Sequence, residues 1–359
     1  MDFKDNPQGY LIYAAIVVYM LGFFPALLTA IIKFRKIMTA LIKRARVLFF
    51  WICVLEGIAA CIVAGVSWSR HNVFPSKALL IALACIVGNY VGVCVIGLAA
   101  KALASKFRKL HSKNAERLQN VTRFLVASSM VCLSIAIIVI IAAFTYRWYH
   151  VKHVPMQNLF EVFLTLGVLT MPISMLCRWF LGLKSLSTDL LLAAVVLFPA
   201  GFIFNADPQH LPPALQSWLF TPHVAVYMLS YVLMAKASFQ AVFQIWTNGL
   251  IEDNIQYEHA TYNMVRIGFP LLTLGLILGS YWGKLAWGDY WGWDPKELWS
   301  LASWLVFVGY FHYRYMFGKK HPRANSLWVI TGMAAIIITL LWVNLSRLFP
   351  GLHSYATSM

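Results

Sequence analysis

Charged residues are scarce in this sequence. Only 12% of its 359 residues are Asp, Glu, Lys or Arg, whereas 60% are hydrophobic. A soluble globular domain usually carries about 25% charged residues, which cover its surface. The composition therefore excludes a water-soluble globule and predicts an integral membrane protein.

The sequence also lacks any Cys-x-x-Cys motif, and its few cysteines fall in apolar stretches or at the end of one. This absence argues against a zinc knuckle, a thiol–disulfide exchanger and a covalent haem site on this chain. The cysteines are interpreted as small buried hydrophobic residues. They are Cys53, Cys61, Cys85, Cys94, Cys132 and Cys177.

Long apolar stretches are what the sequence has in abundance. A bilayer core of roughly 30 Å needs about 20 apolar residues per helical span. Lipid offers no partner to backbone N–H and C=O groups, and the alternation typical of a barrel is missing, so each span is predicted to be an α-helix. The N-terminus has no cleavable signal pattern, so the first span is expected to be retained. The fold class is thus an all-α polytopic bundle of about ten helices, at approximately 10–32, 47–68, 78–100, 124–146, 159–177, 188–204, 223–246, 263–282, 298–317 and 325–348.

The formal charge of +16 is distributed unevenly between the loops. With the N-terminus outside, 18 lysines and arginines fall in inner loops and 7 in outer segments. This positive-inside bias predicts that both termini lie outside. The basic charge is thereby interpreted as a topology signal that contacts anionic lipid, and nucleic acid is not an expected partner.

The basic loop at 101–123 is the best candidate for a domain boundary. We predict an N-terminal three-helix unit with this loop over residues 1–120, and a seven-helix domain over 121–359. An outer segment at 283–298 belongs to the second domain. It is too short and too polar to cross the bilayer.

That outer segment concentrates aromatic residues. Trp287, Tyr290, Trp291 and Trp293 fall within seven residues, and the intervening glycines, Gly288 and Gly292, allow a planar molecule to approach the backbone. The competing interpretation is an interfacial aromatic belt.

The next residues, Asp-Pro-Lys-Glu at 294–297, form the pattern of a capping box with proline at the first helical position. The ninth helix is therefore expected to start at Asp294. Capping is the main role predicted for this aspartate, and a ligand-facing role is the alternative.

The string Trp-Gly-x-x-Trp-x-Trp-Asp at 287–294 resembles the tryptophan-rich haem-handling signature of cytochrome c biogenesis proteins. Its continuation to Leu301 is similar to the CcsA (ResC) family of System II cytochrome c synthases. Residues 158–161 and 351–355 also resemble that family. The resemblance covers about residues 155–355, and residues 1–120 show no such motif.

Three of the ten histidines stand out once the resemblance is considered. By themselves, His223 and His353 at the outer ends of helices read as ordinary interfacial residues, and His312 as part of an inner aromatic belt. The resemblance implies that His223 and His353 are axial ligands of haem iron on the outer side, and that His312 is an intramembrane haem ligand. It further implies that the ring, a non-covalently held haem b, lies on residues of the tryptophan segment, namely Trp287, Gly288, Trp291, Trp293 and Asp294.

The function implied by the resemblance is export of haem and its covalent attachment to the Cys-x-x-Cys-His thiols of an apocytochrome c. The partners implied are a CcsB/ResB-like membrane subunit, which supplies a second intramembrane histidine, the apocytochrome, and thiol-reducing proteins. The location implied is the bacterial cytoplasmic membrane or the thylakoid membrane, with the tryptophan segment facing the periplasm or lumen. The alternatives are a haem transporter or chaperone without synthase activity, and a helical scaffold or ion transporter with an aromatic belt.

Two charged residues fall well inside predicted spans, Lys236 in the seventh and Glu56 in the second. Charges at such depth are costly and are usually paired or functional. A pair between the two residues and a contact from Lys236 to a haem propionate are both open.

Overall fold

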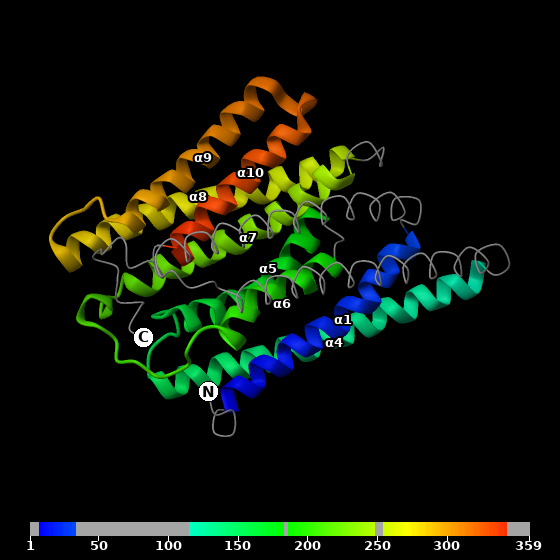
Figure 1. Cartoon of the computed structure of the whole chain (residues 1–359), viewed down its shortest axis with the longest axis horizontal. Helices are drawn as coiled ribbons and strands as arrows, with labels where there is room; N and C mark the ends of the chain where they lie inside the picture. The colour runs from blue at the N-terminus through cyan, green and yellow to red at the C-terminus, as the bar shows by residue number, and fades with distance from the viewer. Residues whose placement is uncertain (1–6, 34–114, 183–185, 248–253, 343–359) are drawn as a thin grey trace, which may run out of the picture. The chain divides into compact units, whose positions relative to one another are not determined.

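A computed structural model describes residues 7–33, 115–182, 186–247 and 254–342. The regular structure in these ranges is entirely helical, and the ranges contain no strand, which fits the predicted all-α class (Figure 1). Two short 3-10 helices, η2 (Pro213–Leu215) and η3 (Gly318–Lys320), and a π-helical turn, η4 (Ile338–Trp342), accompany the long helices. The long helices are α1 (Pro7–Lys33), α4 (Ala115–Val151), α5 (Leu159–Leu181), α6 (Leu186–Phe202), α7 (Phe220–Thr247), α8 (Asn254–Trp287), α9 (Pro295–Phe317) and α10 (Pro322–Ile337).

Eight of the ten predicted spans coincide with these helices. Six of the helices, α1, α4, α5, α7, α8 and α10, are long and apolar enough to cross a membrane, and α6 is a shorter apolar helix. The predicted spans at 47–68 and 78–100 lie outside the described residues. A polytopic helical membrane protein is thus confirmed, and the count of ten stays a prediction.

The chain divides into two compact units, residues 1–28 with 125–359 and residues 29–124. Within the second unit, the structure describes only the end of α1 and the start of α4. The boundary predicted near residue 120 depends on the basic loop, most of which lies outside the described residues. That boundary therefore stays a prediction.

Helices α7 and α8 form the most extensive helix pair of the first unit. Three glycines on α8 allow this close packing, because a Cβ at Gly268 would lie 3.2 Å from Leu233 and one at Gly275 would lie 3.0 Å from the Tyr227 ring. The third is Gly279. Gly275 and Gly279 are four residues apart and therefore share a face of α8, as small residues do at helix contacts in membranes.

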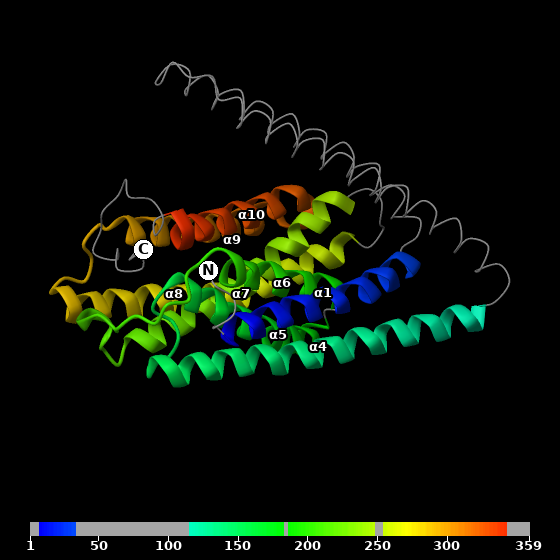
Figure 2. The ribbon, with the colours of Figure 1, turned by 60° about the horizontal axis from the view of Figure 1, so that its bottom comes forward.

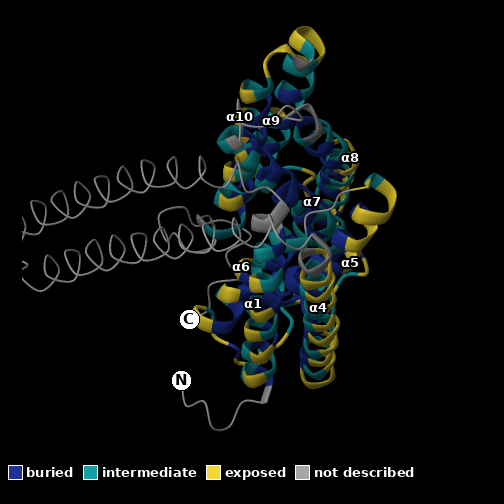
Figure 3. Ribbon diagram, turned by 90° about the vertical axis from the view of Figure 1, so that its right-hand side faces the viewer, coloured by how far each residue is buried: buried dark blue, intermediate teal, exposed yellow. Residues whose placement is uncertain are grey.

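Helix α5 lies at the centre of the unit and α4 at its edge. In the most apolar 18-residue stretch of α5, 67% of the residues are buried inside the protein, compared with 22% in the corresponding stretch of α4. Figure 3 shows the exposed residues of α4 along its outer side. Helix α10 packs against both α9 and α7, and these helices run side by side in Figures 1 and 2. The exposed apolar surface of α4 is what lipid contact requires.

The connections at 152–158, 203–219 and 288–294 gather at one end of the unit, which we call the tryptophan end. Gln157 Nε2 donates to the His210 carbonyl at 2.9 Å, and Trp282 Nε1 donates to the Ala214 carbonyl at 3.1 Å. The loop charges predict that this end faces outside.

The buried Lys236 on α7 is paired across three helices, far from the tryptophan end. Its ammonium forms an ion pair with Asp189 of α6 and donates to Ser174 Oγ of α5 at 3.0 Å. Glu56, one partner considered for it, lies outside the described residues. The pair with Asp189 satisfies the charge in the protein interior, as a span in lipid requires.

Candidate functional site

A pocket opens at the tryptophan end, between the start of α5, the nearby halves of α7 and α8, the start of α9 and the turn η4 that follows α10. Most of its wall is apolar or aromatic, and a few polar groups converge on it, as in typical small-molecule sites. Its wall includes His223, Tyr227, Trp282, Trp291 and Lys296.

His223 lies in the first turn of α7, which begins at Phe220. Its Nδ1 lies 3.0 Å from the carbonyl oxygen of Gly275 on α8. A carbonyl only accepts, so Nδ1 carries the proton and Nε2 of the neutral ring is left as the basic nitrogen. Histidines that bind metals are commonly oriented by such a bond. The imidazole is therefore held in the tautomer that can coordinate iron through Nε2.

Neighbouring rings and a glycine fix the plane of this imidazole. Trp282 stacks on it with centroids 5.8 Å apart and planes at 21°, and Tyr227 contacts it edge-on at 5.1 Å. A Cβ at Gly279 would lie only 2.5 Å from His223 Cε1. Any side chain at this position would therefore displace the imidazole.

The predicted tryptophan segment is divided between several environments. Helix α8 continues through Trp287, whose ring packs on Trp282 at 4.8 Å and 66°, and Gly288 then turns the chain at φ +91°. Trp291 lines the pocket. Trp293, at φ +55°, is 67% exposed and its ring is perpendicular to that of Trp291. The rings do not form one flat surface, and the tryptophans that line the pocket are Trp282 and Trp291.

Asp294 caps α9 as predicted. Its carboxylate accepts a hydrogen bond from the Lys296 backbone amide at 2.8 Å. The Glu297 carboxylate in turn accepts one from the Asp294 backbone amide at 3.1 Å, which completes the capping box. Glu297 also accepts from the Gly292 amide at 2.9 Å. The capping box therefore ties the tryptophan segment to the first turn of α9.

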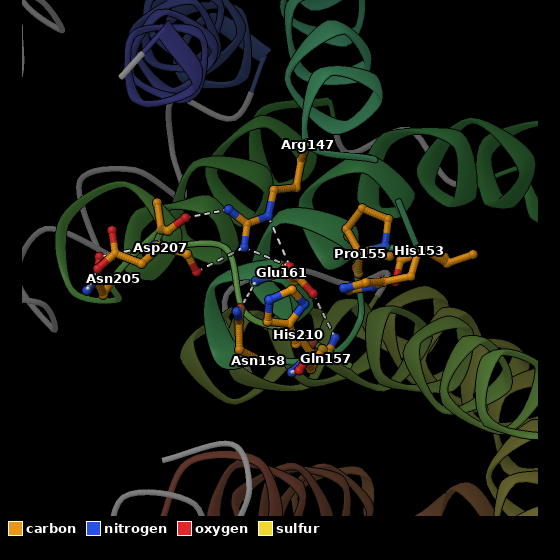
Figure 4. Close-up of polar contacts among 12 residues, drawn as sticks. Arg147, His153, Pro155, Gln157, Asn158, Glu161, Asn205, Asp207 and His210 are labelled. Atoms are coloured by element: carbon orange, nitrogen blue, oxygen red, sulfur yellow. Dashed lines mark hydrogen bonds and ion pairs between the residues drawn. The ribbon is translucent and has the colours of Figure 1, made fainter. Parts of the chain in front are cut away.

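The α5 side of the pocket is anchored by a buried ion pair (Figure 4). Arg147 of α4 donates to Glu161 Oε1 at 2.8 and 3.0 Å, and to the Ala206 and Asp207 carbonyls. Both side chains of the pair are at most 2% exposed. Glu161 Oε2 accepts from the Gln157 amide at 2.8 Å, and Asn158 caps α5 by accepting from the Glu161 amide at 2.9 Å. Gln157 and Asn158 line the pocket, so this network sets the position of its wall.

The sequence alone does not identify several of these residues. It indicates Arg147 only as an outer loop charge and Trp282 only as part of a span, and Glu161 only as the last residue of the stretch 158–161 that resembles the family. The one available signal is the spacing Gly275-x-x-x-Gly279-x-x-Trp282, which places small residues and an indole near the end of one helix.

The other predicted haem ligands lie elsewhere. His312 is exposed near the opposite end of α9, about 27 Å along the helix from the capping residue Asp294 at 1.5 Å per residue. Its Nδ1 donates to the Val308 carbonyl at 2.9 Å, which leaves Nε2 as the basic nitrogen. His353 lies outside the described residues. The structure thus brings His223 and Trp291 to one pocket and places His312 far from it.

Lys296 adds a positive charge to the pocket wall. It lies in the first turn of α9, just before the span predicted at 298–317. Removal from solvent lowers its pKa to about 8, although the nearby Asp294 carboxylate partly opposes this shift.

Residues 156–350 match the sequence model of a family described as cytochrome c assembly protein. The match spans more than half of the chain. This chain belongs to the cytochrome c assembly protein family. The resemblance inferred from the tryptophan motif is therefore confirmed, and with it a role in cytochrome c biogenesis.

Curated relatives agree with the family. A protein of Prochlorococcus marinus (strain MIT 9303) named cytochrome c biogenesis protein CcsA is 30% identical over 276 residues, 64% of this chain and 84% of the relative. Proteins of the same name from Guillardia theta and Mesostigma viride are 30% and 27% identical over 266 and 264 residues. They cover 63% and 58% of this chain, and 83% and 79% of their own lengths.

The part that matches the cytochrome c assembly protein family contains the whole pocket, from Met156 to Leu340. It also contains His312. His353 lies just beyond it, and Arg147, which anchors the pocket from α4, lies before it. The family match is thus concentrated on the helices that form the pocket.

Proposed function

We propose that this member of the cytochrome c assembly family binds haem in the pocket, with His223 as an iron ligand, and attaches it to apocytochrome c. The observation that carries the proposal is the fixed tautomer of His223, whose Nε2 is the basic nitrogen in a largely apolar pocket lined by indoles. A histidine on a rigid element is a common protein ligand of haem iron.

The reaction proposed is the addition of each thiol of a Cys-x-x-Cys-His motif across a haem vinyl group. The S–H hydrogen and the sulfur add to the two vinyl carbons and form a thioether, so nothing leaves and no net oxidation occurs. The described residues contain no nucleophile next to a general base around the pocket, and the thiols belong to the substrate. Catalysis is therefore proposed to consist of positioning.

His353 would be a second residue to hold the haem iron, and His312 would be the residue that first meets haem arriving from the inner side. A CcsB/ResB-like subunit is the proposed source of a further intramembrane histidine. Thiol-reducing proteins would keep the apocytochrome cysteines reduced. The pocket would face the periplasm of a bacterium or the lumen of a thylakoid.

The decisive test is the absorption spectrum of the chain purified from haem-replete cells. We expect a Soret band that weakens and shifts in His223→Gly and recovers when imidazole is added. His150→Gly is the matched control, because His150 lies exposed in the last turn of α4 and is not part of the pocket. A wild-type chain without a Soret band, or a His223→Gly variant with a native one, would refute haem binding at this site.

Co-expression with an apocytochrome separates a synthase from a carrier. Covalent haem on the apocytochrome that depends on His223 supports a synthase. Haem found only on this chain, and only non-covalently, would support a transporter or chaperone instead.

A further inference from the structure

The cationic side chains of the tryptophan end differ in their interaction partners. Arg147 is paired with Glu161, Lys284 donates to the Gly288 carbonyl, and Lys152 lies 4.0 Å from the centroid of the Tyr149 ring. The ammonium of Lys296 forms no hydrogen bond or ion pair with any residue of the described ranges. Its electrostatic neighbour is Asp294, whose carboxylate already accepts the backbone N–H of Lys296.

Lys296 is half-buried, and a cation partly withdrawn from water without a partner is usually completed by an anion. Lys296 lies on the wall of the same pocket as His223, but on a different helix. The rest of the wall is mainly apolar, with Leu159, Val162 and Leu276 among its residues. These features together suit an amphipathic ligand with an apolar body and an acidic group at its edge.

We propose that Lys296 binds a carboxylate at the edge of a porphyrin whose metal is coordinated by His223. This inference rests on the proposed function and extends it, because it assigns the group that recognises the acidic edge of the substrate. One contact from α7 and one from α9 would fix both the centre and the rotation of the ring. A ring rotated by half a turn would place its carboxylates away from Lys296, so this residue also determines which edge carries the vinyl groups presented for attachment.

The capping box makes Lys296 available for this role. Asp294 and Glu297, the carboxylates next to Lys296 in sequence, accept hydrogen bonds from backbone amides of the tryptophan segment and the first turn of α9. The start of α9 adds the partial positive charge of a helix N-terminus. The acidic neighbours therefore accept hydrogen bonds from the backbone, and neither forms an ion pair with the Lys296 ammonium.

The test uses the full-length chain in detergent and four probes. They are iron protoporphyrin IX, its dimethyl ester, and the metal-free forms of both, whose binding is followed by absorption or fluorescence. The esters keep the apolar ring and lose the carboxylate charges. The metal-free forms remove the contribution of iron coordination by His223 to binding. The contact of His223 with iron and the contact of Lys296 with a carboxylate are therefore measured separately.

We expect the wild-type chain to bind the diacids about 10-fold more tightly than the diesters, with or without iron, as charge-assisted bonds of this kind imply. Lys296→Gln should bind diacid and diester equally, at the wild-type affinity for the diester. Lys296→Arg should restore part of the preference. Lys284→Gln removes the charge of another lysine at the same end, one that does not line the pocket, and it should behave as the wild type.

The outcomes distinguish this inference from the proposed function. If Lys296→Gln keeps the 10-fold preference while His223→Gly loses the iron spectrum, the carboxylate assignment is wrong and haem binding stands. If the wild-type chain binds none of the probes, both are wrong. The thermal unfolding temperature of each variant, compared with that of the wild type, shows whether the variant has a folding defect. A preference for diacids that is lost in Lys284→Gln as well would also refute a specific role of Lys296.

Discussion

Gly279 controls the position of the His223 imidazole at the scale of single residues. Because a Cβ there would lie 2.5 Å from the ring, the absence of a side chain on α8 is what allows the histidine of α7 to donate to Gly275 and stack on Trp282. A residue without a side chain thus orients the one proposed to bind iron.

Gly279→Ala should displace this imidazole. Overpacking of this kind costs about 1–3 kcal/mol, so we expect haem affinity to fall about 10-fold and the Soret band to shift. Gly9→Ala is the control, because among the described residues its new methyl group would meet only the Tyr13 ring, at 3.8 Å. Unchanged haem affinity and spectrum in Gly279→Ala would show that the imidazole position is not critical.

The lowered pKa of Lys296 predicts a pH dependence of porphyrin binding. Below a pKa of about 8 the side chain is charged, and above it the charge is lost. The affinity for diacid porphyrin should therefore fall as pH rises above about 8, and a bound carboxylate should move this decrease to higher pH. Titrations from pH 6.5 to 9.5 measure it, with the diester as reference.

Lys296→Arg should bind equally well across that range, because arginine stays charged. A decrease retained in this variant would assign the titration to another group facing the pocket. Those groups are His223, Tyr227 and Tyr231 of α7 and Glu297 of α9, with Asp294 next to them. The pocket residues at the start of α5, on α8 and in η4 carry no ionisable side chain.

At the scale of elements, the first turn of α9 connects the tryptophan segment to a membrane helix. Asp294 is 5% exposed and its carboxylate accepts from the Lys296 amide. Because asparagine caps helices about as well as aspartate does, substitution separates the capping role from a role that needs negative charge.

Asp294→Asn should keep both stability and haem attachment if the residue acts as a cap. Asp294→Ala should lose about 1 kcal/mol of helix stability and misplace Trp291 and Lys296. Thermal unfolding and the Soret spectrum of each variant test this. A loss of haem binding in Asp294→Asn with unchanged unfolding would instead support a direct role for the carboxylate.

The Arg147–Glu161 pair joins α4, α5 and the 203–219 connection. Removing one partner of a buried pair leaves an uncompensated charge and costs about 3–5 kcal/mol. Glu161→Gln and Arg147→Met should each lower the thermal unfolding temperature in detergent, and the double variant should lose less than the sum. Arg123→Gln, an exposed change on the same helix, is the control. Additive losses would show that the two residues are not coupled.

For the whole molecule, the distribution of basic residues predicts which side each end of the bundle faces. In a variant without native cysteines, Pro208→Cys at the tryptophan end should react with an impermeant thiol reagent added outside. Lys320→Cys at the other end should react only after the membrane is permeabilised. The reverse pattern would overturn the predicted orientation, and with it the side on which haem is attached.

Much of the architecture could be derived from the sequence, because it depends on local physics. Apolar length predicted eight helices that the structure contains, since lipid leaves the backbone no other way to satisfy its hydrogen bonds. The capping box at Asp294 and the place of His223 in the first turn of α7 also follow from neighbouring residues. The motif at 287–294 correctly indicated the family.

Only the tertiary structure decided which residues share the pocket, because helices distant in sequence meet there. The tautomer of His223 depends on a carbonyl of α8, and the pairing of Lys236 depends on Asp189 of α6. Periodicity along one helix carries no information about such contacts. The sequence by itself determined a helical membrane protein of this family, whereas packing between helices decided that Trp282, Trp291 and Lys296 line one pocket with His223 and that Trp293 is exposed.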